Sequence, residues 1–169
     1  MLGGSIQFDF DVNSQQECSC VGQVSLLAMP AINPDGSLNL SDTQFGCDAR
    51  GLTFEGALCP EFTLFEGNMY GFRTTPRACD APTEKGYFST CDAEGDLAVD
   101  VKDQTDFTYG PNMDIDTNRT MTIRVDFHAD DTGNTLVGYD VTISQEATGK
   151  SFTISKSGDY LAKLSPYLK

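Results

Sequence analysis

Two glutamates, five positions apart, are the residues whose type and spacing point most directly to chemistry. Glu61 and Glu66 lie in the segment 59–68, CPEFTLFEGN. On a regular strand Glu61 and Thr63 share one face and Glu66 points to the other, but a β-bulge between Thr63 and Glu66 brings both carboxylates to one face. Two carboxylates about 5 Å apart suit a retaining glycosidase, with Glu61 as nucleophile and Glu66 as proton donor. A bare pair at this spacing is more commonly two solvated side chains.

The composition excludes several classes of partner. Eleven basic residues against 25 acidic ones give a net charge of −14, which repels nucleic acid phosphates and anionic membrane surfaces. No apolar run approaches the roughly 20 residues of a membrane span. Residues 1–4, MLGG, lack the charged start and apolar block of a signal peptide. We expect a soluble protein that binds neither nucleic acid nor membrane, with any targeting sequence already removed.

The cysteines indicate disulfide bonds rather than a metal site. None of the six forms a C-x-x-C pair, and the single histidine, His128, cannot complete a Cys/His zinc set. His128 falls on the polar face of a predicted strand and is interpreted as solvated. Sequons at Asn39 and Asn118 agree with an oxidising, glycosylating compartment. We expect a secreted, extracellular glycoprotein that uses no metal or cofactor.

Short strands must position the two glutamates. Apolar and polar residues alternate in 6–12 and in 121–128, and turn residues at 131–134 lead from the latter into a second run at 136–144, which predicts a hairpin. Residues 160–168 fit either a helical turn or one more strand. Five further segments are expected to be strands, the last two on weaker signals: 23–29, 61–65, 152–155, 85–89 and 106–109.

Many short strands separated by turn signals predict an all-β fold, an antiparallel sandwich or barrel. The chain shows no repeat and no break in composition, so residues 1–169 are expected to form a single domain. The stretch 30–56 is rich in Gly, Asn and Asp, and a loop of that length is usually functional. We expect this stretch to form a wall of a cleft.

The surroundings of the two glutamates resemble a known family. Residues 61–68, EFTLFEGN, followed by TPRAC at 75–79, are similar to the E-x-D-x-x-E-A-N and T-P-H-x-C signature of glycoside hydrolase family 7, the fungal and protist cellobiohydrolases and endoglucanases. The order of the matches makes the resemblance specific over nearly the whole chain. The further matching segments are 4–12, 18–29, Cys47-Asp48, Cys91-Asp92, 109–111 and 115–117.

The resemblance implies a concanavalin-like jelly-roll β-sandwich with a glycan-binding cleft on its concave face and a cellulose-type β-1,4-glucan as substrate. It implies that Glu61 is the nucleophile and Glu66 the acid/base, with Thr63 in the position of an orienting residue. Four residues are assigned to substrate binding: Asp48, Asn68, Tyr70 and Arg77.

The resemblance also implies an incomplete domain. Family members are well over twice this length, and residues 165–169 resemble the lead-in to a further core strand, so the sandwich is expected to be partial at its C-terminal end. A longer polypeptide that supplies the missing segment is favoured over a further chain that completes the sheet, since long exposed edges are aggregation sites.

The sequence departs from the family's pattern at the site. Thr63 stands where the family has Asp and Arg77 where it has His, and a threonine carries no charge to shape the titration of the carboxylates. The chain has no tryptophan, the usual platform for sugars. We therefore expect weak or undetectable hydrolysis, which Thr63→Asp raises. Three further positions depart from the family: Val21, Ser25 and Gly67. Four aromatic residues are candidate substitutes for Trp, although aromatic residues in strands more commonly belong to the core: Tyr70, Phe72, Tyr87 and Tyr109.

The family's cysteine order, together with reach, implies the disulfides Cys47–Cys59 and Cys79–Cys91, each closing a loop beside the glutamate strand. Cys18 and Cys20 exceed normal disulfide geometry when extended. In the family the counterpart of Cys18 pairs with a segment outside this chain.

Two functions stay open. One is a retaining, endo-acting β-1,4-glucan hydrolase with Glu61 and Glu66 as its catalytic pair. The other is an extracellular structural or glycan-binding relative whose site decayed. A variant of this second function is a lectin-like module of a larger assembly, which differs from it mainly in whether free glycan binds. The survival of both glutamates favours the enzyme, whereas Thr63, Arg77 and the lack of Trp favour decay.

Overall fold

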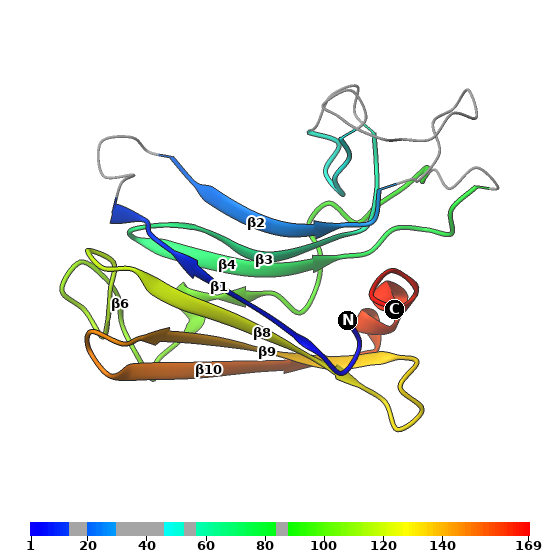
Figure 1. The fold of residues 1–169 in the computed structure, drawn as a ribbon. Coiled ribbons are helices and arrows are strands. Elements are labelled where there is room, and N and C mark those ends of the chain that lie inside the picture. The colour runs from blue at the N-terminus through cyan, green and yellow to red at the C-terminus, as the bar shows by residue number, and fades with distance from the viewer. Residues whose placement is uncertain (14–19, 30–45, 53–56, 84–87) are drawn as a thin grey trace.

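The computed structural model describes residues 1–13, 20–29, 46–52, 57–83 and 88–169, and two four-stranded antiparallel sheets face each other in it (Figure 1). The hairpin sheet has the order β1-β8-β9-β10, the glutamate sheet has the order β2-β3-β4-β5, and β6 and β7 form a small parallel pair. The expected all-β antiparallel sandwich is confirmed. The strands are β1 Ser5–Phe10, β2 Gly22–Leu27, β3 Glu61–Asn68, β4 Gly71–Arg77, β5 Val99–Asp100, β6 Tyr109–Gly110, β7 Ile115–Asp116, β8 Met121–Ala129, β9 Leu136–Gln145 and β10 Lys150–Ser157.

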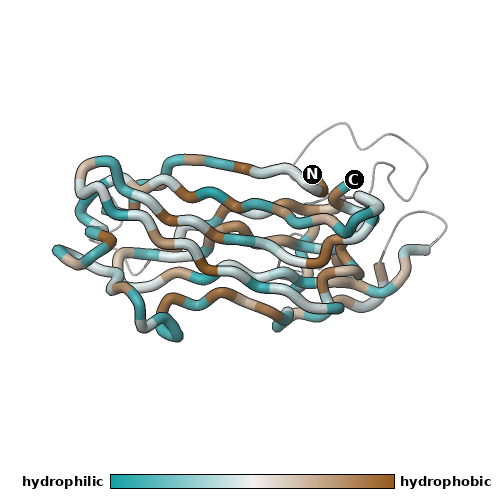
Figure 2. The backbone as a smooth tube through the Cα atoms, turned by 90° about the horizontal axis from the view of Figure 1, so that it is seen from below, coloured by the Kyte–Doolittle hydropathy of each residue, from teal (hydrophilic) through white to brown (hydrophobic). Residues whose placement is uncertain are grey.

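The hairpin sheet follows the alternation in the sequence. β8 and β9 form the predicted hairpin, with Ile123 opposite Ile143 and Val125 opposite Val141, all fully buried. Figure 2 looks at the outside of this sheet, where hydrophilic and hydrophobic positions alternate along the strands. The hairpin turn is held by Asp130, whose carboxylate accepts a hydrogen bond from the backbone N–H of Asn134 at 2.9 Å. This bond is the largest cause that holds the pKa of Asp130 well below its usual range.

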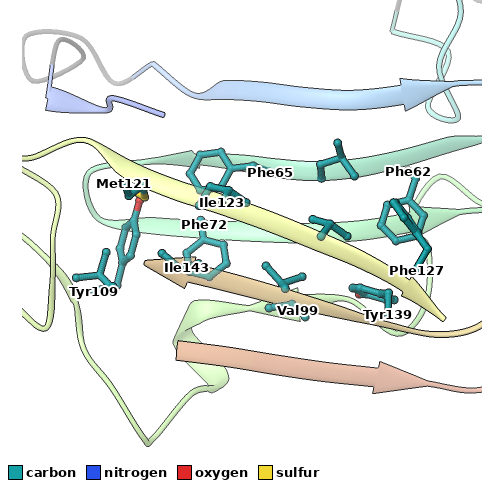
Figure 3. Close-up of a cluster of buried hydrophobic side chains, with 14 of the residues drawn as sticks. Phe62, Phe65, Phe72, Val99, Tyr109, Met121, Ile123, Phe127, Tyr139 and Ile143 are labelled. Atoms are coloured by element: carbon teal, nitrogen blue, oxygen red, sulfur yellow. The ribbon is translucent and has the colours of Figure 1, made fainter. Parts of the chain in front are cut away.

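Aromatic side chains from both sheets form the centre of the core. The ring of Phe62 in β3 lies 5.2 Å from Phe127 and 5.1 Å from Tyr139, both edge-on, and these two rings come from the hairpin sheet. Figure 3 shows these side chains pointing toward one another between the sheets. On the same side of the glutamate sheet, Phe65 stacks on Phe72 at 5.7 Å. Burial of several large rings is the main stabilising term for such a sandwich.

Strand β4 is a strand that the sequence analysis missed, because Pro76 interrupts its pattern. A proline is tolerated where no neighbouring strand needs its N–H. β5 pairs only with Arg73 and Thr74, so β4 is an edge strand at Pro76. The short strand β5 has no alternating pattern long enough to predict it.

The C-terminal segment is a 3₁₀ helix, η4, over Asp159–Tyr167, which confirms the helical alternative for 160–168. It buries Leu161 and Leu164 at one end of the sandwich. A short 3₁₀ turn, η3, spans Val101–Asp103. The two chain ends lie side by side (Figure 1), where the backbone N–H of Leu2 donates to the carbonyl of Leu168 at 3.1 Å.

The two weaker strand predictions are not confirmed over their predicted lengths. Residues 85–87 of the candidate 85–89 lie outside the described residues, and residues 88 and 89 are not in a strand. In 106–109 only Tyr109 belongs to a strand, because the backbone turns at this point into the short β6. Most of the stretch 30–56, expected to be a cleft wall, also lies outside the described residues. No helix among the described residues is long and apolar enough to cross a membrane.

Candidate active site

A β-bulge in β3 brings Glu61, Thr63 and Glu66 to one face of the glutamate sheet, the face opposite the core. The pairing of β3 with β4 shifts register between Thr63 and Glu66, where the sequence analysis placed the bulge. On the other side of β3 the shift falls between Val24 and Ser25. The hydroxyl of Thr74 donates to the carbonyl of Leu64 at 2.8 Å and so satisfies a backbone group inside the bulge.

Glu61 is fully buried, with 0% of its surface exposed, and its carboxylate is surrounded by donors. Its Oε1 accepts from the Nε2 of Gln23 at 2.7 Å, from the hydroxyl of Thr63 at 2.7 Å and from that of Ser25 at 3.2 Å. Its Oε2 accepts from the backbone N–H of Ala49 at 3.4 Å. A buried carboxylate requires such partners, and here both oxygens are occupied.

Arg77 supplies the positive charge that matches Glu61. Only 3% of this residue is exposed, and its NH1 lies 3.6 Å from Glu61 and donates to the hydroxyl of Thr63 at 2.7 Å. Its Nε donates to the carbonyl of Ala93 at 2.9 Å, and its NH2 lies 3.9 Å from Glu66. Burial is the largest influence on the guanidinium and lowers the pKa of Arg77, while Glu61 raises it. One guanidinium therefore reaches both carboxylates.

Glu66 has a second arginine partner and more solvent contact than Glu61. Arg50 NH1 lies 3.3 Å from Glu66, and the two side chains are 26% and 25% exposed. Arg50 NH2 also donates to the Oε1 of Gln23 at 3.2 Å, which joins the loop to strand β2. As a proton donor Glu66 must carry a proton, whereas these ion pairs are formed by its carboxylate.

The loop that carries Ala49 and Arg50 is fixed by a disulfide. Cys47 is bonded to Cys59, immediately before β3, and Cys79 is bonded to Cys91, immediately after β4. Both bonds have the pairing that was expected. Cys20 is also disulfide-bonded, and the expectation for Cys18 falls outside the described residues.

Two predicted substrate-binding residues support local structure. Asp48 is buried, and its Oδ1 accepts from the N–H of Arg50 at 2.6 Å and from that of Leu52 at 3.2 Å, so it shapes the loop beside Glu61. Asn68 ends β3, and its Oδ1 accepts from the N–H of Tyr70 at 2.8 Å. Contact of either residue with a glycan stays a prediction.

The aromatic candidates separate clearly. Phe72 and Tyr109 belong to the core, with their rings 5.2 Å apart, which confirms the favoured interpretation of aromatic residues in strands. Tyr70 is 75% exposed in the turn between β3 and β4. Tyr87 lies outside the described residues.

The remaining candidates lie elsewhere. The Nε2 of His128 lies 2.9 Å from the carboxylate of Asp140 on the hairpin sheet, and His128 is half-exposed. Asn118 is exposed beside β7, and Asn39 lies outside the described residues. No group of three or more His, Cys, Asp or Glu among the described residues is arranged to hold a metal ion.

Several site residues were missed by the sequence analysis. Gln23 lies two positions before Ser25 on β2, and Arg73 and Thr75 lie four and two positions before Arg77 on β4. Alternate residues of a strand share a face, so this spacing from recognised residues was the available signal. Arg50 comes from a loop and carried no such signal. At Gly67, where the family has Ala, a Cβ would lie 2.7 Å from the carbonyl oxygen of Gly71.

Comparison with known proteins agrees with this fold. The family described as Glycosyl hydrolase family 7 matches this chain over residues 32–148. The fold is similar to that of an endoglucanase I complexed with cellobiose, at 22% identity and a TM-score of 0.71 over 90% of this chain and 44% of the other. The native structure of the Humicola insolens endocellulase EGI gives 21% identity and a TM-score of 0.67, over 96% of this chain and 45% of the other.

A cellobiohydrolase from Melanocarpus albomyces complexed with cellotetraose gives 19% identity and a TM-score of 0.64, over 99% of this chain and 48% of the other. At these identities the solved structures establish the fold, and the chain spans about half the length of each of them. The match to the family itself covers more than half of the chain. The chain therefore belongs to glycosyl hydrolase family 7.

Proposed function

We propose that the protein is a retaining hydrolase of cellulose-type β-1,4-glucan with low activity. Glu61 attacks the anomeric carbon while Glu66 gives its proton to the departing glycosidic oxygen, which forms a glycosyl-enzyme. Glu66 then takes a proton from the water that releases the sugar. The observation that carries the proposal is the bulge, because it places both glutamates within 4.0 Å of one guanidinium, that of Arg77. A carboxylate separation of about 5 to 6 Å stays part of the proposal.

Low activity follows from the contacts of the two glutamates. The oxygens of Glu61 already accept hydrogen bonds from Gln23, Thr63 and Ser25, so attack must displace donors from a buried group. Glu66 must exchange its ion pairs with Arg50 and Arg77 for a proton before it acts as an acid. Each exchange adds to the barrier.

A second candidate function is glycan binding without turnover. The complete burial of Glu61 and its full set of donors favour this alternative, because they stabilise the site as a structural network. Tyr70, 75% exposed at the end of β3, offers a surface on which a sugar ring stacks. The disulfides Cys47–Cys59 and Cys79–Cys91 support secretion, which we propose for either function.

The test uses a neutral substrate, cellopentaose, and the full polypeptide. NMR of the anomeric protons follows turnover and its stereochemistry, and calorimetry follows binding. We expect slow release of β-anomers, loss of turnover in Glu61→Gln and Glu66→Gln, and no change in Glu146→Gln, whose carboxylate is exposed after β9. Equal turnover by Glu61→Gln and the natural protein contradicts the proposal. Binding without any turnover establishes the second candidate.

A further inference from the structure

The face that carries the two glutamates also gathers arginines. The register of β3 and β4 sets Glu61 opposite Arg77 and Glu66 opposite Arg73. Arg50 reaches the same group from its loop through its ion pair with Glu66 at 3.3 Å. Arg73 and Arg50 both lower the pKa of Arg77 through their charges, which places all three guanidinium groups within electrostatic range of one another.

Among the residues that the structure describes, Arg73 has no anionic partner. Arg77 and Arg50 are matched by Glu61 and Glu66. Arg73 lies opposite Asp100 in the pairing of β4 with β5, but Asp100 forms its ion pair with Lys102 at 3.1 Å.

The nearby carboxylate of Asp48 is turned to the backbone of its own loop. Within the described part of the chain Arg73 therefore forms no ion pair, and the protein as a whole carries a charge of −14.

Three polar atoms of the same group also have no hydrogen-bond partner among the described residues, although they are buried. They are the Nε of Arg50, the Nε of Arg73 and the hydroxyl of Thr75. Thr75 is fully buried and lies opposite Thr63, between the pairs of Arg73 with Glu66 and Arg77 with Glu61. Buried donors without acceptors cost stability, and such groups are satisfied when a ligand supplies the acceptors.

We propose that this face binds an anionic β-linked glycan, with a carboxylate or sulfate substituent of the sugar held by Arg73 and Arg50. The inference rests on the proposed glycan-binding function and narrows its substrate class. The planar guanidinium matches the paired oxygens of carboxylates and sulfates, whereas the hydroxyls of a neutral glucan leave its charge unpaired. At physiological salt the screening length is about 8 Å, so the local arginines act on a bound substituent while the distant acidic residues are screened.

The experiment compares three probes by calorimetry on the full polypeptide: cellotetraose, its C6-carboxylated counterpart and its 6-O-sulfated counterpart. We expect either anionic probe to bind at least tenfold more tightly than cellotetraose. Arg73→Gln should weaken anionic binding by roughly 10- to 100-fold and leave the neutral probe unchanged. Arg124→Gln is the matched control, because it removes the same charge from the exposed face of β8. Arg73→Lys keeps the charge and should retain part of the preference.

Each outcome decides one proposal. A preference for the carboxylated over the sulfated probe, or the reverse, identifies the substituent and supports the inference. Equal binding of neutral and anionic probes overturns it and leaves the proposed glycan function intact. Equal losses in Arg73→Gln and Arg124→Gln also overturn it, because the effect is then one of net charge. Failure of all three probes to bind, with no turnover of cellopentaose, overturns both proposals. Should Arg73→Gln not fold, Arg50→Gln and the salt dependence of the natural protein test the same prediction.

Discussion

The outward faces of the two sheets are built on the same alternation of residues but differ in their polar side chains. On the hairpin sheet Arg124 forms an ion pair with Asp126 at 2.6 Å and His128 lies 2.9 Å from Asp140, and these side chains are partly exposed to solvent. On the glutamate sheet Glu61, Thr63 and Arg77 are buried and share one network. Both disulfides for which the structure describes both cysteines flank the glutamate sheet.

The difference indicates where the chain tolerates change. An exposed ion pair contributes little because water competes for both partners. A buried pair is costly to break because the remaining charge has no substitute for its partner. A polar face that is buried at such a cost and fixed by disulfides is therefore the part of the sandwich to which we assign function.

The largest expected effect is the loss of the buried cation. Arg77→Met leaves the buried carboxyl group of Glu61 without its ion pair, and we expect a loss of about 3 to 5 kcal/mol in the free energy of unfolding. Urea denaturation measures the loss. The matched variant Arg124→Met, on the hairpin sheet, should leave the midpoint unchanged. Equal shifts in the two variants contradict the contrast between the two faces.

The next effect concerns catalysis. The hydroxyl of Thr63 donates to Glu61 and accepts from Arg77, so it transmits only one hydrogen bond to the nucleophile. Thr63→Asp restores the family's residue while Arg77 remains to balance the added buried carboxylate, and we expect hydrolysis of cellopentaose to rise by on the order of 10² to 10³. No gain in this variant favours the non-catalytic function.

The third effect, no larger than the second, is expected from removal of the disulfide Cys47–Cys59. Cys47→Ser with Cys59→Ser releases the loop that carries Ala49 and Arg50, and loss of a bond that closes a loop of this length costs about 3 kcal/mol. We also expect weaker glycan binding, because Arg50 loses its fixed position beside Glu66. Thermal unfolding and calorimetry measure the two effects. Unchanged binding in a folded double variant is incompatible with a role for this loop in the site.

The smallest effect is a pH dependence. Tyr160 accepts a hydrogen bond from the N–H of Ala78 and donates one to Asp92, each at 2.9 Å, and burial is the largest cause that raises its pKa to about 12. The folded state therefore holds this proton more tightly than the unfolded chain, whose tyrosines titrate near 10. The stabilisation is complete below about pH 10 and is lost as the pH rises toward 12.

Tyr160→Phe should flatten the dependence of stability on pH between pH 10 and 12. At neutral pH it should lower the free energy of unfolding by roughly 1 kcal/mol or less. Denaturation midpoints across this range provide the measurement. Tyr70→Phe is the control, since Tyr70 is 75% exposed. An identical profile for the two variants argues against a stabilising role of the Tyr160 phenol.

Local patterns in the sequence predicted much of the fold and part of the site. The strict alternation in 121–128 and 136–144 predicted β8 and β9, because a strand with one buried face must alternate. The bulge between Thr63 and Glu66 followed from the requirement that both carboxylates share a face. β4 was missed because Pro76 is tolerated only where the neighbouring strand ends, and that depends on the length of β5.

By itself, the sequence determined the strand periods and the membership of the family, since these depend on residue types at fixed spacing. The resemblance to that family implied the cysteine pairs around the glutamates. Only the tertiary structure decided the state of the site. Arg50 contacts Glu66 because a disulfide-bonded loop folds back over β3, and Arg73 lies beside Glu66 because β3 and β4 are paired in one register. Such contacts join segments that are far apart in the sequence or depend on how two strands are paired. They therefore arise from the packing of the chain and cannot be predicted from the spacing of residues along it.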